Sequence, residues 1–261
     1  MEKLRKYGSK PFNVAVIHGG PGAPGEVAPV ARELGIMRGV LEPFQSKDTC
    51  EGQAEELKAI LEENADLPVT LVGHSWGAML SFILAARYPS LVKKLIMVSS
   101  AVFEDKYAEE IETTRLMRLN DEERVEALTL LDALGDAARA DKNILLERLV
   151  KLLWTKADSY DPLPFEDEVL EVQYHVNISV MEGAKKLRSS GELLKLGKMI
   201  KCPVIAIHGD YDPHPPDGVK KPLALVLKNF RFILLEKCGH FPWLERQARD
   251  RFYEILKREI G

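Results

Sequence analysis

Residues 67–89, LPVTLVGHSWGAMLSFILAARYP, contain the pattern that decides the fold. Residues 69–72 form a short apolar run, which is typical of a strand buried in a parallel sheet. Residues 76–88 form a long apolar stretch that stops before Pro89, as a helix does. When a turn such as GHSWG joins a strand to a helix, its glycines let backbones pass closely and its serine adopts a strained, exposed conformation. The alternative interpretation is a glycine-rich loop that happens to contain Ser75.

The composition restricts the class of protein. With 261 residues, 46% of them hydrophobic, the chain is long enough for one large α/β domain. A net charge of −4 gives no reason to expect a nucleic acid or a membrane as partner. No apolar run approaches the roughly 20 residues of a membrane helix, and the first residues lack the apolar segment of a signal peptide. Cys50, Cys202 and Cys238 form no C-x-x-C pair. We therefore expect a cytoplasmic protein without disulfides, a monomer or homodimer by default.

Short apolar runs alternate with helical patterns along most of the chain. We expect strands at 13–17, 39–44, 69–72, 94–99, 203–207 and 231–235, and helices at 27–34, 50–64, 76–88 and 242–260. Strands that alternate with helices form right-handed βαβ units. The sequence therefore predicts an α/β fold with a mostly parallel open sheet flanked by helices.

Residues 104–197 break this alternation, because they are helical in pattern and charged, without a convincing strand. Their leucines follow helical spacing and indicate a core rather than a cofactor site: Leu145, Leu146, Leu149, Leu152 and Leu153. We expect an inserted helical cap at 104–197 between the two parts of one core domain, 1–103 and 198–261.

Polar residues follow several of the predicted strands, where open α/β sheets bind ligands. A serine hydroxyl needs an adjacent base, and His240 lies between the last predicted strand and the last helix. The base needs a carboxylate to fix its tautomer, and GDYD at 209–212 offers Asp210 and Asp212. The residues HGGPG at 18–22 let backbone N–H groups approach a substrate, although such residues also form simple tight turns.

Four motifs, in the order HGGPG, GHSWG, GDYD and CGH, resemble those of the α/β-hydrolase superfamily. The first two most resemble its proline iminopeptidase-like branch. The resemblance covers most of the chain outside 104–197, and it implies a cap in the place of that insertion.

The resemblance also implies roles for single residues. Ser75 is the expected nucleophile and His240 the expected base. The usual Gly-x-x-Asp spacing selects Asp212 as the acid, with Asp210 as the alternative. The oxyanion hole is expected to consist of Gly20 and Trp76.

These observations predict a serine hydrolase that cleaves a small ester or amide through an acyl-serine intermediate. Its partner is expected to be a small-molecule or short-peptide substrate. No metal-ligand or nucleotide-binding spacing is present, so we expect neither a metal nor a cofactor.

Two alternatives stay open. A proline iminopeptidase-like aminopeptidase needs acidic residues for a free amino group, and the family's Glu after the cap tryptophan is Thr155 here. Asp158, Asp161 or the acidic run 166–168 could take that role. The second alternative is a non-catalytic protein that binds a ligand on the same fold.

Overall fold

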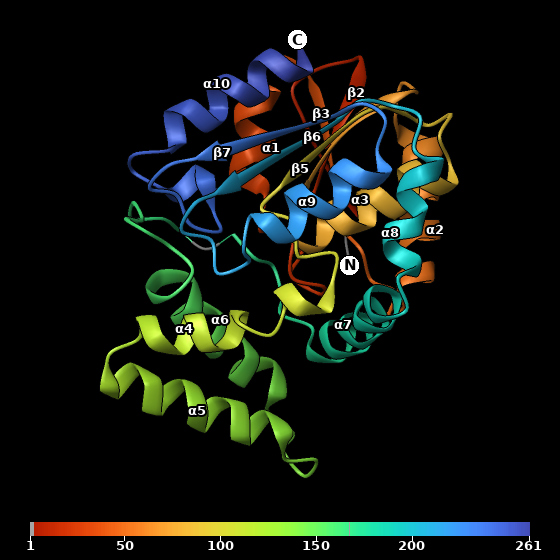
Figure 1. Cartoon of the computed structure of the whole chain (residues 1–261). Coiled ribbons are helices and arrows are strands. Elements are labelled where there is room, and N and C mark those ends of the chain that lie inside the picture. Colours follow the sequence, from red (N-terminus) through yellow and green to blue (C-terminus); the bar gives the residue numbers. More distant parts are fainter. Residues whose placement is uncertain (1–2, 167) are drawn as a thin grey trace.

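The computed structural model describes residues 3–166 and 168–261, and it confirms the predicted fold class. The strands of these residues form one sheet in the order β1-β3-β2-β4-β5-β6-β7 (Figure 1). Strand β1 pairs antiparallel with β3, and the other neighbours pair in parallel. The strands are β1 (Leu4–Tyr7), β2 (Phe12–Ile17), β3 (Gly39–Pro43), β4 (Val69–His74), β5 (Val92–Val98), β6 (Val204–Gly209) and β7 (Phe230–Leu235).

Both faces of the sheet are covered by helices, as Figure 1 shows. Successive strand residues point to opposite faces, so Val14 and Val16 of β2 join one core cluster while Ala15 and Ile17 join the other. The first cluster packs against α1 (Ala28–Gly35) and α10 (Arg249–Ile260). The second packs against α2 (Cys50–Asn64), α3 (Trp76–Arg87), α8 (Glu192–Leu196) and α9 (Asp217–Val226). This two-sided burial explains why the central strands are continuous apolar runs.

The chain between β5 and β6 is helical. Its longer helices are α4 (Ile111–Arg118), α5 (Asp121–Gly135), α6 (Lys142–Lys156) and α7 (Tyr174–Ser189). Helices α4, α5 and α6 lie together away from the sheet (Figure 1) and enclose their own core with Leu130, Leu145 and Leu149. Helix α7 instead adds Val180 and Ala184 to the core under the sheet. We call residues 104–197 the helical insertion; its boundaries as a domain stay a prediction.

Three elements differ from the sequence-based expectation. Strand β1 was not predicted, because LRKY is polar and lies at the sheet edge, half-buried. Helix α9 was not predicted either, and it carries Pro222 inside. The helix predicted at 242–260 is wrong in its first half: Pro242–Leu244 is a short 3₁₀ turn, and α10 begins at Arg249. Buried Glu245, between them, accepts the backbone N–H groups of Tyr160 and Gly239.

Two further observations concern the cysteines and the character of the helices. Cys50, Cys202 and Cys238 are all free thiols, as the sequence predicted. Among the residues that the structure describes, none of the helices combines the length and the apolar character needed to span a bilayer.

Candidate active site

Ser75 occupies a sharp turn between β4 and α3. Its backbone has φ 51° and ψ −115°, a conformation that is uncommon for a residue with a side chain and costs about 1–3 kcal/mol. The turn needs glycines on either side: a Cβ on Gly73 would lie 2.3 Å from the carbonyl oxygen of Gly77, and one on Gly77 would lie 2.3 Å from that of Ile17. The structure therefore has the strand, turn and helix that the GHSWG pattern predicts, rather than an unstructured loop.

His240 and Asp212 come together from two neighbouring loops, after β7 and β6 respectively. The Nδ1 atom of His240 lies 2.8 Å from Oδ2 of Asp212, and both side chains are buried. Asp210 does not reach His240; its Oδ1 accepts the N–H of Cys238 at 3.1 Å. Of the two carboxylates left open by the sequence, Asp212 is thus the one beside the histidine.

The surroundings set the charges of this pair. Burial alone would raise the pKa of Asp212, but the histidines around it, His240 first, hold that pKa well below its ordinary value. Burial likewise lowers the pKa of His240, and the attraction of Asp212 outweighs it, so that the pKa of His240 is raised. An ionised carboxylate only accepts hydrogen bonds, so Nδ1 of His240 carries the proton and Nε2 is left with a lone pair when the ring is neutral. This is the tautomer that a general base needs.

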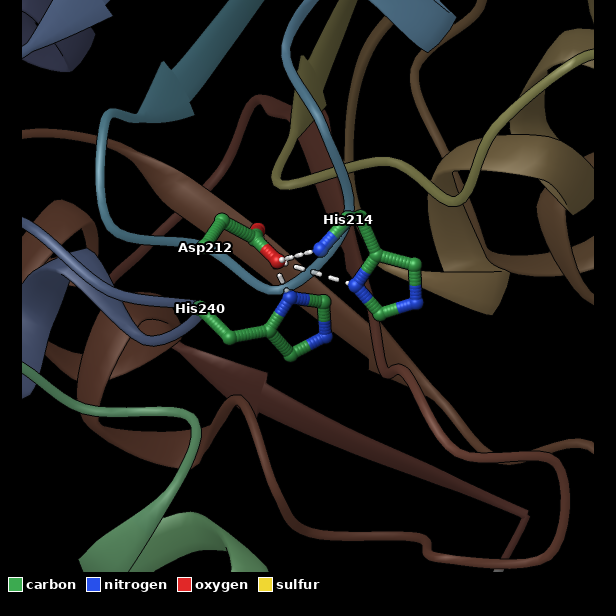
Figure 2. Close-up of side chains that lie close together, drawn as sticks. All are labelled: Asp212, His214 and His240. Carbon is green, nitrogen blue, oxygen red and sulfur yellow. Dashed lines mark hydrogen bonds and ion pairs between the residues drawn. The ribbon is translucent and has the colours of Figure 1, made fainter. Parts of the chain in front are cut away.

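A second histidine, His214, binds the same carboxylate (Figure 2). Its backbone N and its ring Nδ1 both lie 2.9 Å from Oδ1 of Asp212, and its ring stacks on His240. His214 was not among the predicted site residues, although it lies two residues after Asp212 in the chain. Within residues 3–166 and 168–261, Asp212, His214 and His240 are also the one cluster whose ligand atoms lie close enough for a metal ion, within 4.8 Å of one another. The ring Nδ1 atoms already face the carboxylate as donors, which is the arrangement of an acid–base pair.

Glu26 and His74 connect three loops of the site. Oε2 of Glu26 accepts the N–H of Gly19 from the HGGPG loop, and it lies 3.1 Å from Nδ1 of His74 in the GHSWG turn. Nε2 of His74 lies 2.9 Å from the carbonyl oxygen of His240. The loops that carry the predicted oxyanion hole, nucleophile and base are therefore tied together by one buried pair, which the sequence analysis did not identify.

These loops open into a cavity of about 490 Å³. Ser75, His240 and His214 line it, together with Gly20 and Trp76, the residues predicted for the oxyanion hole. Most of its other walls are apolar and come from α6, α7 and the loops beside them, with Leu146, Val150, Trp154, Ile178, Met181 and Phe241 among them. The arrangement places Ser75, His240 and the two backbone segments predicted for the oxyanion hole on one largely apolar cavity.

Arg115 and Asp158 of the helical insertion also line the cavity. Nε and Nη2 of Arg115 donate to the two carboxylate oxygens of Asp158 at 2.7 and 2.8 Å, a two-point ion pair. The carbonyl oxygen of Asp158 accepts the backbone N–H of His240 at 2.7 Å. The insertion thus contacts the backbone of His240, the predicted base.

Comparison with known proteins agrees with this architecture. The solved structure of VinJ superposes with a TM-score of 0.68 at 18% identity, covering 98% of this chain and 93% of that one. Proline iminopeptidase of Mycobacterium smegmatis superposes with a TM-score of 0.65 at 20% identity, covering 98% and 93%. At such identities the likeness concerns the fold.

Two sequence comparisons add to the structural ones. A curated relative, the cis-3-alkyl-4-alkyloxetan-2-one decarboxylase of Shewanella oneidensis, is 36% identical over 56 residues. These residues are 21% of this chain and only 18% of the relative's length. The sequence model of a protein family described as alpha/beta hydrolase fold matches residues 37–247, which is most of the chain. With a seven-stranded sheet of the matching architecture, the chain belongs to the alpha/beta hydrolase fold family.

Proposed function

We propose that this protein is a serine hydrolase that cleaves a small ester or amide through an acyl-Ser75 intermediate. The observation that carries the proposal is the buried Asp212–His240 pair, 2.8 Å apart, on the cavity that Ser75 also lines. Such a pair makes an adjacent hydroxyl nucleophilic.

The steps follow from these groups. Nε2 of His240 takes the proton of the Ser75 hydroxyl while Oγ attacks the acyl carbon. The oxyanion that forms is stabilised by the backbone N–H groups of Gly20 and Trp76. The protonated His240, held by Asp212, then gives its proton to the leaving alcohol or amine. Water activated by the same histidine attacks the acyl-serine, and Ser75 is released with the acid product.

The cavity favours an apolar substrate of modest size. Its walls are mostly aliphatic and aromatic, and such side chains bind alkyl or aryl groups of a ligand. Its charged lining residues Glu147, Lys151, Glu182 and Lys185 are exposed. By its name, the curated relative acts on an oxetan-2-one, which is a cyclic ester. A short-chain ester or β-lactone is therefore the first class of substrate to test.

The aminopeptidase alternative needs a carboxylate that is free to bind an ammonium group. Asp158 pairs with Arg115, and Asp161 lies 3.4 Å from Arg246. Of the acidic run 166–168, Asp167 lies outside the described residues, Glu168 pairs with Arg32, and Glu166 does not line the cavity. Among the described residues that line the cavity, Glu147 and Glu182 are the acids left for this role, and both are exposed. The ester hydrolase therefore has the stronger support.

A fluorophosphonate, which reacts only with an activated serine, tests the proposal by intact mass. We expect one adduct on the wild type and none on Ser75→Ala. The matched pair Asp212→Asn and Asp210→Asn identifies the acid: the first should slow labelling by roughly 10³–10⁴-fold, and the second should label at the wild-type rate.

Substrate panels then separate the alternatives. Turnover of acyl esters without turnover of aminoacyl amides supports the esterase, and the reverse supports the aminopeptidase. A folded wild type that neither reacts with the fluorophosphonate nor turns over any ester or amide would overturn the proposal in favour of a ligand-binding protein.

A further inference from the structure

His214 shares the carboxylate of Asp212 with His240 but has a different position in the cavity. Oδ2 of Asp212 faces His240, whereas Oδ1 faces both the backbone N and the Nδ1 of His214. The two rings stack with centroids 4.7 Å apart and planes at 26°. In Figure 2 the second nitrogen of each ring points away from the carboxylate.

The hydrogen bonds determine which nitrogen of His214 carries its proton. An ionised carboxylate only accepts, so Nδ1 of His214 must donate to Oδ1. Burial lowers the pKa of His214 to about 4, so the ring is neutral near pH 7. A neutral imidazole with a proton on Nδ1 has a lone pair on Nε2. His214 therefore presents a hydrogen-bond acceptor.

Among residues 3–166 and 168–261, this acceptor has no hydrogen-bond partner. The side chain of His214 is 11% exposed, stacks on His240 and lines the same cavity as Ser75. Nothing in the described part of the chain donates a hydrogen bond to its Nε2. A nearly buried acceptor that faces a binding cavity is satisfied by a ligand or by water.

The charges nearby restrict the kind of ligand. Arg115 is close enough for its positive charge to contribute to the lowered pKa of His214. Its Nη1 has no partner among residues 3–166 and 168–261, but the charge of the guanidinium is balanced by Asp158. This end of the cavity offers an acceptor and a donor without excess charge of either sign. It fits a neutral hydroxyl or amide better than a carboxylate or an ammonium group.

We propose that Nε2 of His214 accepts a hydrogen bond from a hydroxyl or N–H group of the substrate, close to the acyl carbon that Ser75 attacks. This inference rests on the proposed function. It defines the substrate class more narrowly: an ester or amide with an apolar chain and one neutral donor beside the scissile bond. A substrate without the donor leaves the acceptor unsatisfied and reacts more slowly.

The competing explanation is that His214 only positions Asp212. Two substitutions distinguish the explanations. His214→Asn keeps an amide N–H in the place of Nδ1, and so can still donate to Asp212, but it has no group at the place of Nε2. His214→Phe keeps the ring that stacks on His240 but removes both nitrogens. A role through Asp212 alone is restored by Asn, whereas a role as substrate acceptor is not.

The experiment compares kcat/KM for two matched pairs of esters. p-Nitrophenyl butyrate and p-nitrophenyl 3-hydroxybutyrate vary the acyl side, and ethyl and 2-hydroxyethyl butyrate vary the alcohol side. We expect the wild type to prefer the hydroxylated member of at least one pair by about tenfold, the effect of one neutral hydrogen bond. Both His214 variants should lose that preference, and His214→Phe should also turn over both esters more slowly than His214→Asn.

Two control variants accompany these. His175→Gln replaces an exposed histidine outside the cavity and should leave rates and preference unchanged. Val150→Ala alters an apolar wall and should affect both members of a pair alike.

The outcomes separate this inference from the proposed function. Normal fluorophosphonate labelling with equal rates in both pairs, or a preference that survives in His214→Asn, would overturn the role of His214 alone. Loss of labelling together with the absence of any ester turnover by the wild type would overturn the proposed function, and the inference with it.

Discussion

The pair Glu26–His74 gives the sharpest test of how the site is held together. His74 lies between two acceptors, Oε2 of Glu26 at 3.1 Å and the carbonyl oxygen of His240 at 2.9 Å. Burial would raise the pKa of Glu26, but His74 in particular holds it below its ordinary value, so Glu26 is ionised. The charge of Glu26 is thus buried, with the His74 ring as its polar partner.

The size of the expected loss in stability follows from the burial of both partners. The side chain of His74 is 2% exposed and that of Glu26 is 3% exposed. Removing the partner of the buried Glu26 carboxylate leaves its charge uncompensated, which costs about 3–5 kcal/mol. We expect this loss in the free energy of unfolding for His74→Phe. Glu26→Gln should cost only about 1 kcal/mol, because its amide oxygen still accepts the N–H of Gly19 and no charge is left buried without a partner.

Urea unfolding of the two single variants and the double variant at pH 7 measures these values. The double variant should be more stable than His74→Phe alone, because it no longer contains the unpaired carboxylate. If His74→Phe costs less than about 1 kcal/mol, or if the two losses simply add, the buried Glu26 carboxylate does not depend on His74 for its stability, contrary to this prediction.

Three further predictions concern pH and metals. Labelling of Ser75 by a fluorophosphonate should become slower at acid pH, with a midpoint above 6.5, the ordinary pKa of histidine. The reason is that His240 has a raised pKa and acts as a base only when unprotonated. A labelling rate that stays constant down to pH 5.5 would contradict this. Burial raises the pKa of Glu42 from 4.5 to about 7. Between pH 4.5 and about 7 the folded chain therefore keeps a proton on Glu42 that the unfolded chain loses. The free energy of unfolding accordingly falls as the pH rises through this range. Glu42→Gln should therefore gain stability relative to the wild type, by up to about 3 kcal/mol at pH 8, and none at pH 4.5, as measured by urea unfolding. A chelator should leave the labelling rate unchanged, because the ring protons that face Asp212 occupy the positions an ion would need; a loss restored by zinc would refute this.

The sheet could be predicted from the sequence because its central strands are covered on both faces. Burial on two sides requires apolar residues at every position, and such runs are easily recognised in strands like β2 and β4. Strand β1 has no such pattern, since its place at the edge leaves it half-buried and depends on pairing with β3, which lies more than thirty residues later in the chain.

In the candidate site, too, residues in local sequence motifs could be predicted, whereas residues that depend on long-range contacts could not. Ser75 and His240 belong to local motifs whose order along the chain is informative. The structure puts Asp212, and not Asp210, beside the histidine. The contacts that hold these residues are long-range, such as the one between His74 and His240, 166 residues apart. A single Glu such as Glu26 or Glu245 has no local pattern that distinguishes it from the many exposed ones, so neither was found from the sequence.

These long-range contacts also limit how a substrate can reach Ser75. The backbone N–H of His240 is bound by Asp158, and Glu245 accepts N–H groups from both Gly239 and Tyr160. Lifting the whole helical insertion would break these bonds and displace the base. Exposed residues on α6 and α7, such as Glu147, mark where the cavity meets solvent.

We therefore expect access to the cavity through local movement of α6 and α7, while the contact between Asp158 and His240 stays closed. Amide hydrogen exchange measures this directly. The amide of His240 should exchange as slowly as those of the central strands, and amides along α6 and α7 should exchange faster. Equal and rapid exchange at His240 and across 104–197 would instead mean that the insertion opens as one body, and that the base is assembled only when it closes.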